Sequence, residues 1–151
     1  MEKIIVRQLM ESCEALECAL KKYTDSFNGS TLINFSLSEA DRKKYLKKYN
    51  LFSIELTAVT RSFEDAVASL SKMICQADRE CDPLATERLS EIFEGYQRLS
   101  ASISDFIIKS ENVFLNNINE KDTFRPSELL FISKELTCDL GIFKKYLEDR
   151  K

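Results

Sequence analysis

The chain has 151 residues, of which 44% are hydrophobic and 31% are charged, a balance typical of a folded, soluble protein rather than a disordered chain. We expect one domain spanning residues 1–151. The chain contains 3 glycines and 2 prolines, too few for the tight turns of a β-sandwich. A formal net charge of −3 provides no positive field, so nucleic acid binding is not expected.

The compartment is indicated by the first residues and by the cysteines. The apolar run Ile4-Ile5-Val6 is too short for a signal peptide, because Arg7 interrupts it. No window approaches the roughly 18 continuous apolar residues of a membrane span. The cysteines are odd in number and lie inside helical patterns, at Cys13, Cys18, Cys75, Cys81 and Cys138. These features favour a reducing compartment, and we expect the protein to be cytoplasmic.

Two helical regions are predicted in the first half of the chain. Over residues 1–27, apolar side chains recur every three or four positions, which is the spacing of one helix face. Asn28-Gly29 then marks the end of this helix, since glycine tolerates the left-handed conformation found there. The second region covers residues 38–79, either unbroken or divided near Asn50.

Two further helices are predicted in the second half. Asp82-Pro83 is a start signal, because aspartate caps a helix and proline tolerates the first helical position. The third helix should reach Asn119, which makes it about 37 residues or roughly 55 Å long. Its apolar residues follow a heptad repeat, at Leu89, Ile92, Tyr96, Leu99, Ile103, Phe106, Ser110, Val113 and Asn117. The fourth helix opens at Pro126.

Long helices joined by short connections predict an all-α fold. We expect an elongated, antiparallel, up-and-down bundle of four helices, or of five if the second region divides. The third helix is longer than the first and the last, which span roughly 39 and 36 Å. Its overhanging apolar row therefore predicts pairing with another chain, for example in a homodimer.

Catalytic chemistry is not indicated. The chain has no histidine, which removes the usual nucleophile pairs and the commonest metal ligand. No two cysteines have the spacing of a zinc site, so we interpret the cysteines as small core or boundary residues. Glu11, Glu14 and Glu17 should lie solvated on the polar side of the first helix, rather than in the dry cleft that general acid catalysis requires. We expect no enzyme, no metal and no cofactor.

A basic segment, residues 42–49, is one candidate for function. At 100° per residue its lysines share one helix face and its apolar residues share the other, with Lys43, Lys44, Lys47 and Lys48 against Tyr45, Leu46 and Tyr49. Such a face is a candidate for contact with anionic lipid head groups, nucleic acid or an acidic partner. The alternative is an ordinary solvated helix surface.

Two helices that are apolar on two sides are the second candidate. In the third helix, Ile108 and Leu115 point away from the heptad row, and in the fourth, Phe131 and Ile142 lie roughly opposite the apolar stripe. Contiguous exposed apolar patches usually mark interfaces, which makes these four side chains candidates for binding a partner protein. The alternatives are that both helices are central in the bundle, or that the segment 32–37 covers the patch.

A long stretch of the chain also has the pattern of a known helical family. A first apolar helix, marked by Ser62-Phe63 with Ala66 and Leu70, is followed by an acidic break at residues 78–82. A long second helix carries Leu89, Phe93, Leu99 and Val113. The last helix is marked by Phe131, Leu136 and residues 143–146. Residues 62–148 thereby resemble the helical arms of BAR domains, crescent-shaped dimers that bind curved membranes. The resemblance implies lipid contact through Lys43, Lys44, Lys47 and Lys48. The pattern departs from that family at Pro126, which interrupts a continuous second helix.

The sequence therefore favours a non-enzymatic module that acts through apolar helix faces. We expect a protein partner, including self-association as a homodimer, and a scaffold or interaction role. The alternative is a BAR-like dimer that binds an anionic membrane surface through its lysine face.

Overall fold

The computed structural model describes residues 2–27, 39–116 and 126–150 of the chain, and these residues form four α-helices and no β-strand. The helices are α1 (Glu2–Asp25), α2 (Glu39–Arg79), α3 (Pro83–Asn116) and α4 (Pro126–Glu148). The prediction of an all-α fold is confirmed. None of these four helices carries an apolar stretch long enough to cross a bilayer. The segment 32–37, considered above as a cover, lies outside the described residues.

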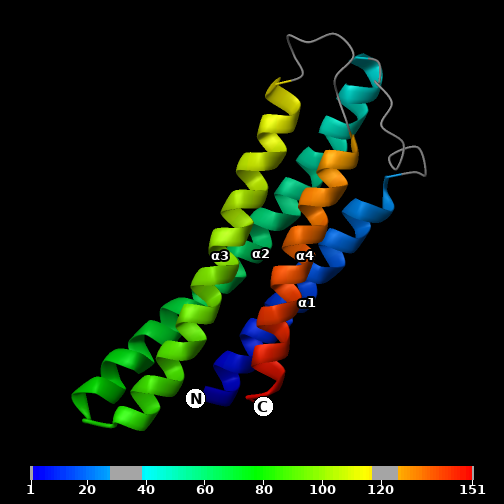
Figure 1. The fold of residues 1–151 in the computed structure, drawn as a ribbon. Helices are drawn as coiled ribbons and strands as arrows, with labels where there is room; N and C mark the ends of the chain where they lie inside the picture. Colours follow the sequence, from blue (N-terminus) through cyan, green and yellow to red (C-terminus); the bar gives the residue numbers. More distant parts are fainter. Residues whose placement is uncertain (1, 28–38, 117–125, 151) are drawn as a thin grey trace.

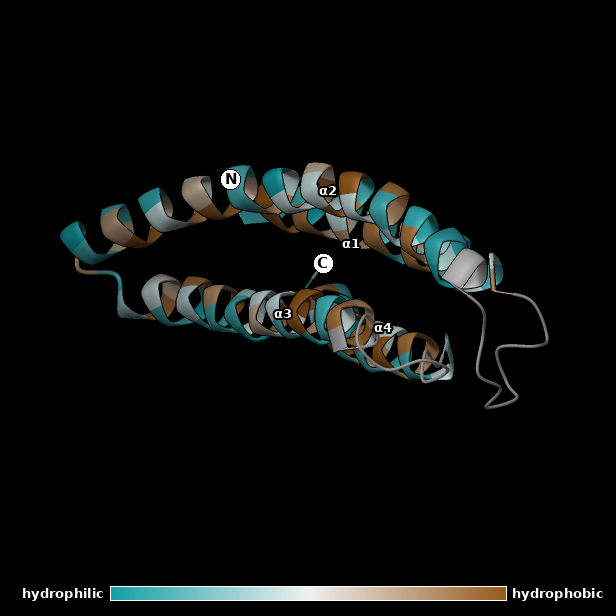
Figure 2. Ribbon diagram, turned by 90° about the horizontal axis from the view of Figure 1, so that it is seen from above, coloured by the Kyte–Doolittle hydropathy of each residue, from teal (hydrophilic) through white to brown (hydrophobic). Residues whose placement is uncertain are grey.

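The helices form an elongated antiparallel bundle (Figure 1). Each helix packs against the next one in the sequence, and α1 closes the bundle by packing against α4. α1 begins and α4 ends at the same end of the bundle (Figure 1). Seen from above, α1 and α2 form one layer while α3 and α4 form the other (Figure 2). The up-and-down arrangement is therefore as predicted, and each layer has an outer face of its own.

A continuous core runs along the bundle. The predicted heptad residues of α3 that the structure describes are all buried, at Leu89, Ile92, Tyr96, Leu99, Ile103, Phe106, Ser110 and Val113. Asn117, the last residue of the predicted row, and Asn119, the predicted end of the helix, lie outside the described residues. Towards the end where α2 begins, rings from three helices pack together: Tyr23 and Phe52 have centroids 4.8 Å apart, and Phe52 and Phe106 5.5 Å apart. Burying one leucine or phenylalanine contributes about 1.5–3 kcal/mol, so this core is the main source of stability.

α2 is a single helix of 41 residues, about 61 Å long at the usual rise. Asn50 is exposed on its surface, whereas Tyr49 and Phe52 on either side of it are buried. A polar side chain in an exposed position leaves the backbone hydrogen bonds of the helix intact. The alternative of a division near Asn50 is therefore wrong, and the four-helix form of the prediction is correct.

α2 and α3 extend past the ends of α1 and α4 as a two-helix hairpin (Figure 1). Two ion pairs mark where the shorter helices stop: Glu2 contacts Arg88 at 3.2 Å, and Arg150 contacts Glu91 at 2.6 Å. Beyond that level α3 packs on α2 of the same chain, where Ala77 is buried. The overhang of α3 thus has an intrachain partner, and helix length alone does not require a second copy.

The tip of the hairpin is a tight turn. Cys81 adopts a left-handed conformation with φ of 54°. The N–H of Asp82 donates to the carbonyl of Ala77 at 3.0 Å, and the N–H of Cys81 donates to the carbonyl of Asp78 at 3.1 Å, the paired bonds of a Schellman motif. Oδ1 of Asp82 then accepts a hydrogen bond from the N–H of Ala85 at 3.1 Å. The predicted start of the third helix is therefore confirmed, with Asp82 as its cap.

Candidate interaction surfaces

The carboxylates of α1 are exposed, as predicted for Glu11, Glu14 and Glu17. Glu17 contacts Lys144 of α4 at 3.3 Å. An exposed ion pair of this kind contributes little to stability, because solvent screens the two charges. Within the parts of the chain that the structure describes, no group of three or more acidic or cysteine side chains is arranged to hold a metal ion.

The cysteines differ from the prediction. Cys13 lies on the core side of α1 and is fully buried, and burial raises the pKa of its thiol to about 12. The other four are exposed free thiols, namely Cys18, Cys75, Cys81 and Cys138. The interpretation of the cysteines as core or boundary residues is therefore wrong for these four, because they occupy outward positions or the hairpin tip rather than the apolar row of their helix.

The four predicted partner-binding side chains are all exposed. Ile108 and Leu115 on α3 are 59% and 60% exposed, and Phe131 and Ile142 on α4 are 64% and 66% exposed. Both helices belong to the same layer of the bundle (Figure 2). The alternative that α3 and α4 are central helices does not hold, since each has a solvent-facing side.

Three of the four side chains lie within about 10 Å of one another along the bundle axis. Lys109 contacts Glu135 at 3.3 Å across the α3–α4 groove, which fixes the antiparallel register of the two helices. In that register Phe131, one turn before Glu135, falls between the levels of Ile108 and Leu115. The groove between these apolar side chains is polar, because Lys109 also contacts Asp105 at 2.9 Å.

Ile142 lies apart from the other three, about 10 Å further along the layer in the same register. There it borders a hollow of about 170 Å³ in the α3–α4 groove. Gly95 of α3 is part of its lining, and because a Cβ there would lie 3.1 Å from Cε1 of Phe143, the glycine lets this ring pack closely against α3. Its lining also includes Arg98, which has no ion pair with any described residue. The outer α3–α4 face thus combines three apolar side chains, spread over about 10 Å, with a separate small recess.

The lysine face is divided in the structure. Lys43, Lys44 and Lys47 are exposed, whereas Lys48 is half-buried. Nζ of Lys48 donates to the carbonyl of Ser26 at 2.5 Å and lies 5.1 Å from the ring centroid of Tyr45. Burial and the nearby Lys44 both lower the pKa of Lys48. Three of the four predicted lysines are therefore free to meet an anionic partner, and the fourth has a role inside the fold.

Sequence reasoning missed a second apolar surface, on the opposite layer. Leu51 and Ile54 of α2 are 58% and 68% exposed. They border a hollow of about 410 Å³ between α1 and α2, whose lining includes Ala19, Tyr23 and Phe52. The available signal was the position of Leu51 and Ile54 outside the apolar stripe of α2. Leu84 at the hairpin tip, 69% exposed, also went unpredicted.

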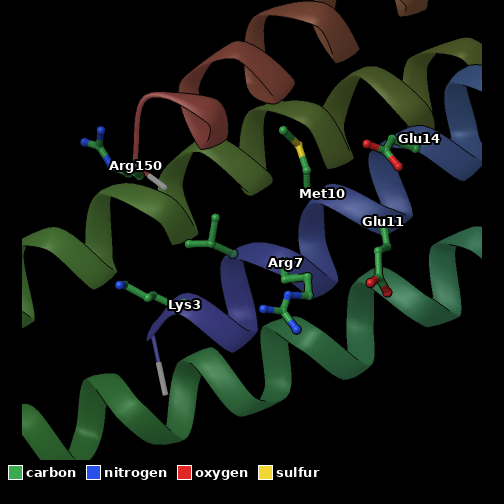
Figure 3. A pocket seen from close by; sticks show the side chains of 7 residues that line it. Lys3, Arg7, Met10, Glu11, Glu14 and Arg150 are labelled. Carbon is green, nitrogen blue, oxygen red and sulfur yellow. The ribbon is translucent and has the colours of Figure 1, made fainter.

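A third hollow, of about 460 Å³, lies where the first turns of α1 meet the end of α4 (Figure 3). Lys3 and Arg7 border one part of it and Glu14 another, with Met10 between them. Arg150 also borders it, but this guanidinium is held by Glu91 at 2.6 Å and lies 3.7 Å from the ring centroid of Tyr146. Its charges are of both signs, so it indicates no single class of ligand.

Comparisons with protein-family models, with curated proteins and with solved structures found no match to this chain. The BAR resemblance stays a prediction, and function has to be argued from the surfaces themselves.

The two layers of the bundle present different surfaces to solvent. The outer α3–α4 face offers apolar contact area around a polar groove, and the α1–α2 face offers an apolar hollow near exposed lysines. The apolar centre with a polar rim that is common in protein interfaces is found on the α1–α2 face, whereas on the α3–α4 face a polar groove lies between the apolar side chains.

Proposed function

We propose that the protein is a non-enzymatic interaction module that binds a partner protein through the outer face of α3 and α4. The observation that carries this proposal is the exposure of Ile108, Leu115, Phe131 and Ile142, each by more than half, on two neighbouring helices of one layer. Water-exposed apolar groups on one face gain free energy when a partner covers them. The partner is expected to present a helical face, since α3 and α4 leave a groove between them.

The free energies of burial and association limit how tightly such a face can bind. Burying an apolar side chain contributes about 1.5–3 kcal/mol, so four of them offer roughly 6–12 kcal/mol. Association costs about 4–15 kcal/mol in lost freedom of motion. The four side chains alone therefore give weak binding, and a useful affinity requires apolar side chains from the partner as well. A second copy of this chain meets that requirement by presenting the same four residues, so self-association is the first form to test.

The experiment compares a double variant on the α3–α4 face with a single control variant. Ile108→Glu/Leu115→Glu places two carboxylates on the α3–α4 face, and Leu84→Glu places one on an equally exposed position at the hairpin tip. Light scattering coupled to size exclusion reports self-association, and capture from the native cell with each variant as bait reports other partners. We expect the double variant to lose the association and Leu84→Glu to retain it, with equal helicity in both. Equal loss of association in the two variants, or no loss in either, would show that the α3–α4 face is not the binding surface.

The alternative is an anionic membrane surface bound by the lysine face. Its support is the exposure of Lys43, Lys44 and Lys47 on one side of α2. Sedimentation with vesicles tests it: binding should require anionic lipid and weaken as salt is raised, because such attraction is screened over about 8 Å at physiological ionic strength. Binding that is absent or insensitive to salt would dispose of this alternative.

A further inference from the structure

The outer side of α2 carries a second helical row in addition to the one that faces the core. Its members follow the alternating spacing of three and four residues that a coiled-coil partner requires, and they are Lys44, Lys47, Leu51, Ile54, Ala58 and Arg61. All six side chains are exposed. We call this row the outer seam of α2. It is about 26 Å long at the usual helical rise, or nearly five turns.

Apolar and basic residues occupy different parts of the outer seam. Its centre is apolar, with Leu51 and Ile54 exposed by 58% and 68%. Both ends are cationic, with Lys44 and Lys47 before the centre and Arg61 after it. None of these three cations forms an ion pair with a described residue.

The surface beside the apolar centre is concave. The hollow of about 410 Å³ between α1 and α2 opens next to Leu51 and Ile54, with the small side chain of Ala19 in its lining. Glu55 is the acidic residue of that lining, and it is already paired with Lys22 at 3.2 Å. The hollow is therefore apolar inside and bordered by an excess of positive charge.

We propose that the outer seam of α2 and the adjoining hollow bind an acidic amphipathic helix of a partner protein. Apolar side chains of that helix would cover Leu51 and Ile54, and its carboxylates would meet Lys44, Lys47 and Arg61. Charges arranged in this way fix the register of the partner and accelerate the encounter. This surface lies on the opposite layer from the α3–α4 face, so the module can hold two partners at once.

The geometry favours a helix over a membrane as the occupant. A helix that lies in a bilayer surface inserts its apolar face, but in α2 that face is buried in the core, at Tyr45, Tyr49 and Phe52. What remains outside is a hollow with two aliphatic side chains at its edge, and a convex helix fills a hollow better than a flat lipid surface does. The pKa of Lys48 is lowered first by burial and second by the neighbouring charge of Lys44, and carboxylates of the partner placed near Lys44 would offset the repulsion between the two cations.

The test uses two synthetic peptides as probes. One is a 21-residue amphipathic helix, about six turns, with leucines on one face and glutamates on its flanks. The other is the same peptide with every glutamate replaced by lysine. Fluorescence anisotropy measures affinity for the full chain, and the NMR signals of the Leu51 and Ile54 methyl groups locate the site. We expect the acidic peptide to bind with shifts at these methyl groups, and the lysine peptide not to bind.

Two variants with the same change in net charge distinguish binding at the outer seam from a general effect of charge. Lys44→Glu/Lys47→Glu should weaken binding of the acidic peptide by at least about ten-fold, which is a modest loss for two charge reversals at an interface. Lys134→Glu/Lys145→Glu makes the same change in net charge on exposed positions of α4 and should leave the affinity within about two-fold.

Several results would overturn the proposal. These are no binding of the acidic peptide, equal binding of the lysine peptide, or equal weakening by the two charge variants. Vesicles of anionic lipid that shift the Leu51 and Ile54 methyl signals when the acidic peptide does not would assign the surface to a membrane instead. A dimer that dissociates in Lys44→Glu/Lys47→Glu would assign it to a second copy.

Discussion

The ammonium nitrogen of Lys48 lies 2.5 Å from the backbone carbonyl oxygen of Ser26, the first residue past the end of α1. The last carbonyls of a helix lack partners within the helix and form the negative end of its dipole. Arg42 bonds in the same way to the carbonyl of Phe114, in the last turn of α3, at 3.3 Å. Because α2 begins where both neighbours end, its basic segment satisfies two helix C-termini.

Replacing Lys48 by methionine tests this role. Lys48→Met keeps an unbranched side chain against Tyr45 but removes the donor and the charge, so we expect the free energy of unfolding to fall by about 1–2 kcal/mol. Lys47→Met changes an exposed side chain on the same helix and should stay within about 0.5 kcal/mol of the wild type. Urea denaturation measures both. Equal effects of the two substitutions would show that the bond to Ser26 contributes nothing.

Two glycines in helix interiors provide a second test. Gly141 of α4 is exposed, and a Cβ there would meet nothing within 4 Å. Gly141→Ala should therefore raise the free energy of unfolding by about 0.5–1 kcal/mol, the difference in helix propensity. At Gly95 of α3, a Cβ would lie 3.1 and 3.2 Å from two ring carbons of Phe143.

The opposite sign is expected at Gly95. Phe143 is 3% exposed, so its ring has to shift against packed neighbours, and overpacking of this kind costs about 1–3 kcal/mol, which exceeds the gain in propensity. We expect Gly95→Ala to lower the free energy of unfolding by about 1 kcal/mol. Thermal unfolding resolves the difference, because 1 kcal/mol shifts Tm by about 2–4 °C in a chain of this size. Stabilisation by both substitutions would show that the ring has room to move.

The helices could be predicted from the sequence because apolar periodicity identifies the buried side of each helix. The same periodicity placed Ile108 and Phe131 outside the core. It could not show that Lys48 bonds to the carbonyl of Ser26, because this contact depends on how α2 packs against the end of α1. The two residues are far apart in the sequence. Leu51 and Ile54 were missed for a related reason. The sequence shows that these aliphatic side chains lie outside the apolar stripe, but not that they border a hollow between α1 and α2.

The hairpin tip gives a third prediction. Cys81 holds a left-handed conformation, which costs a non-glycine residue about 1–2 kcal/mol. We expect Cys81→Gly to raise the free energy of unfolding by about 1 kcal/mol, since the Schellman bonds use only the backbone. Cys75→Gly, in the interior of α2, should lower it by about 1 kcal/mol. A destabilising effect of Cys81→Gly would mean that the thiol itself makes a favourable contact.

The hydroxyl of Tyr23 gives a fourth prediction. This group is buried and has no hydrogen-bond partner among the described residues. A buried unpaired hydroxyl costs about 1–3 kcal/mol, so Tyr23→Phe should raise the free energy of unfolding by about 1 kcal/mol. Tyr23→Leu removes the same hydroxyl together with the ring that packs on Phe27 and Phe52, and it should be destabilising. A loss of stability in Tyr23→Phe would show that an ordered water satisfies the hydroxyl.

Buried acidic protons predict a loss of stability at alkaline pH. Burial raises the pKa of Cys13 from 9.0 to about 12, and the pKa of Tyr49 from 10.0 to about 12. In the unfolded chain these groups ionise at their lower, ordinary pKa values. As the pH rises, ionisation therefore stabilises the unfolded state before it can stabilise the folded state. Their contribution is fully present below pH 9.0 and is lost as the pH rises towards about 12.

The variant that isolates this effect is Cys13→Ala, compared with Cys18→Ala. Cys13→Ala removes the buried thiol, so its free energy of unfolding should fall less steeply between pH 9.0 and about 12 than that of the wild type. Cys18→Ala is the control, because it makes the same substitution at an exposed position of the same helix. Guanidinium denaturation at a series of pH values measures the slopes. Identical slopes in all three proteins would mean that the Cys13 thiol ionises as easily in the folded state as in the unfolded one, which its complete burial in the α1 core should prevent.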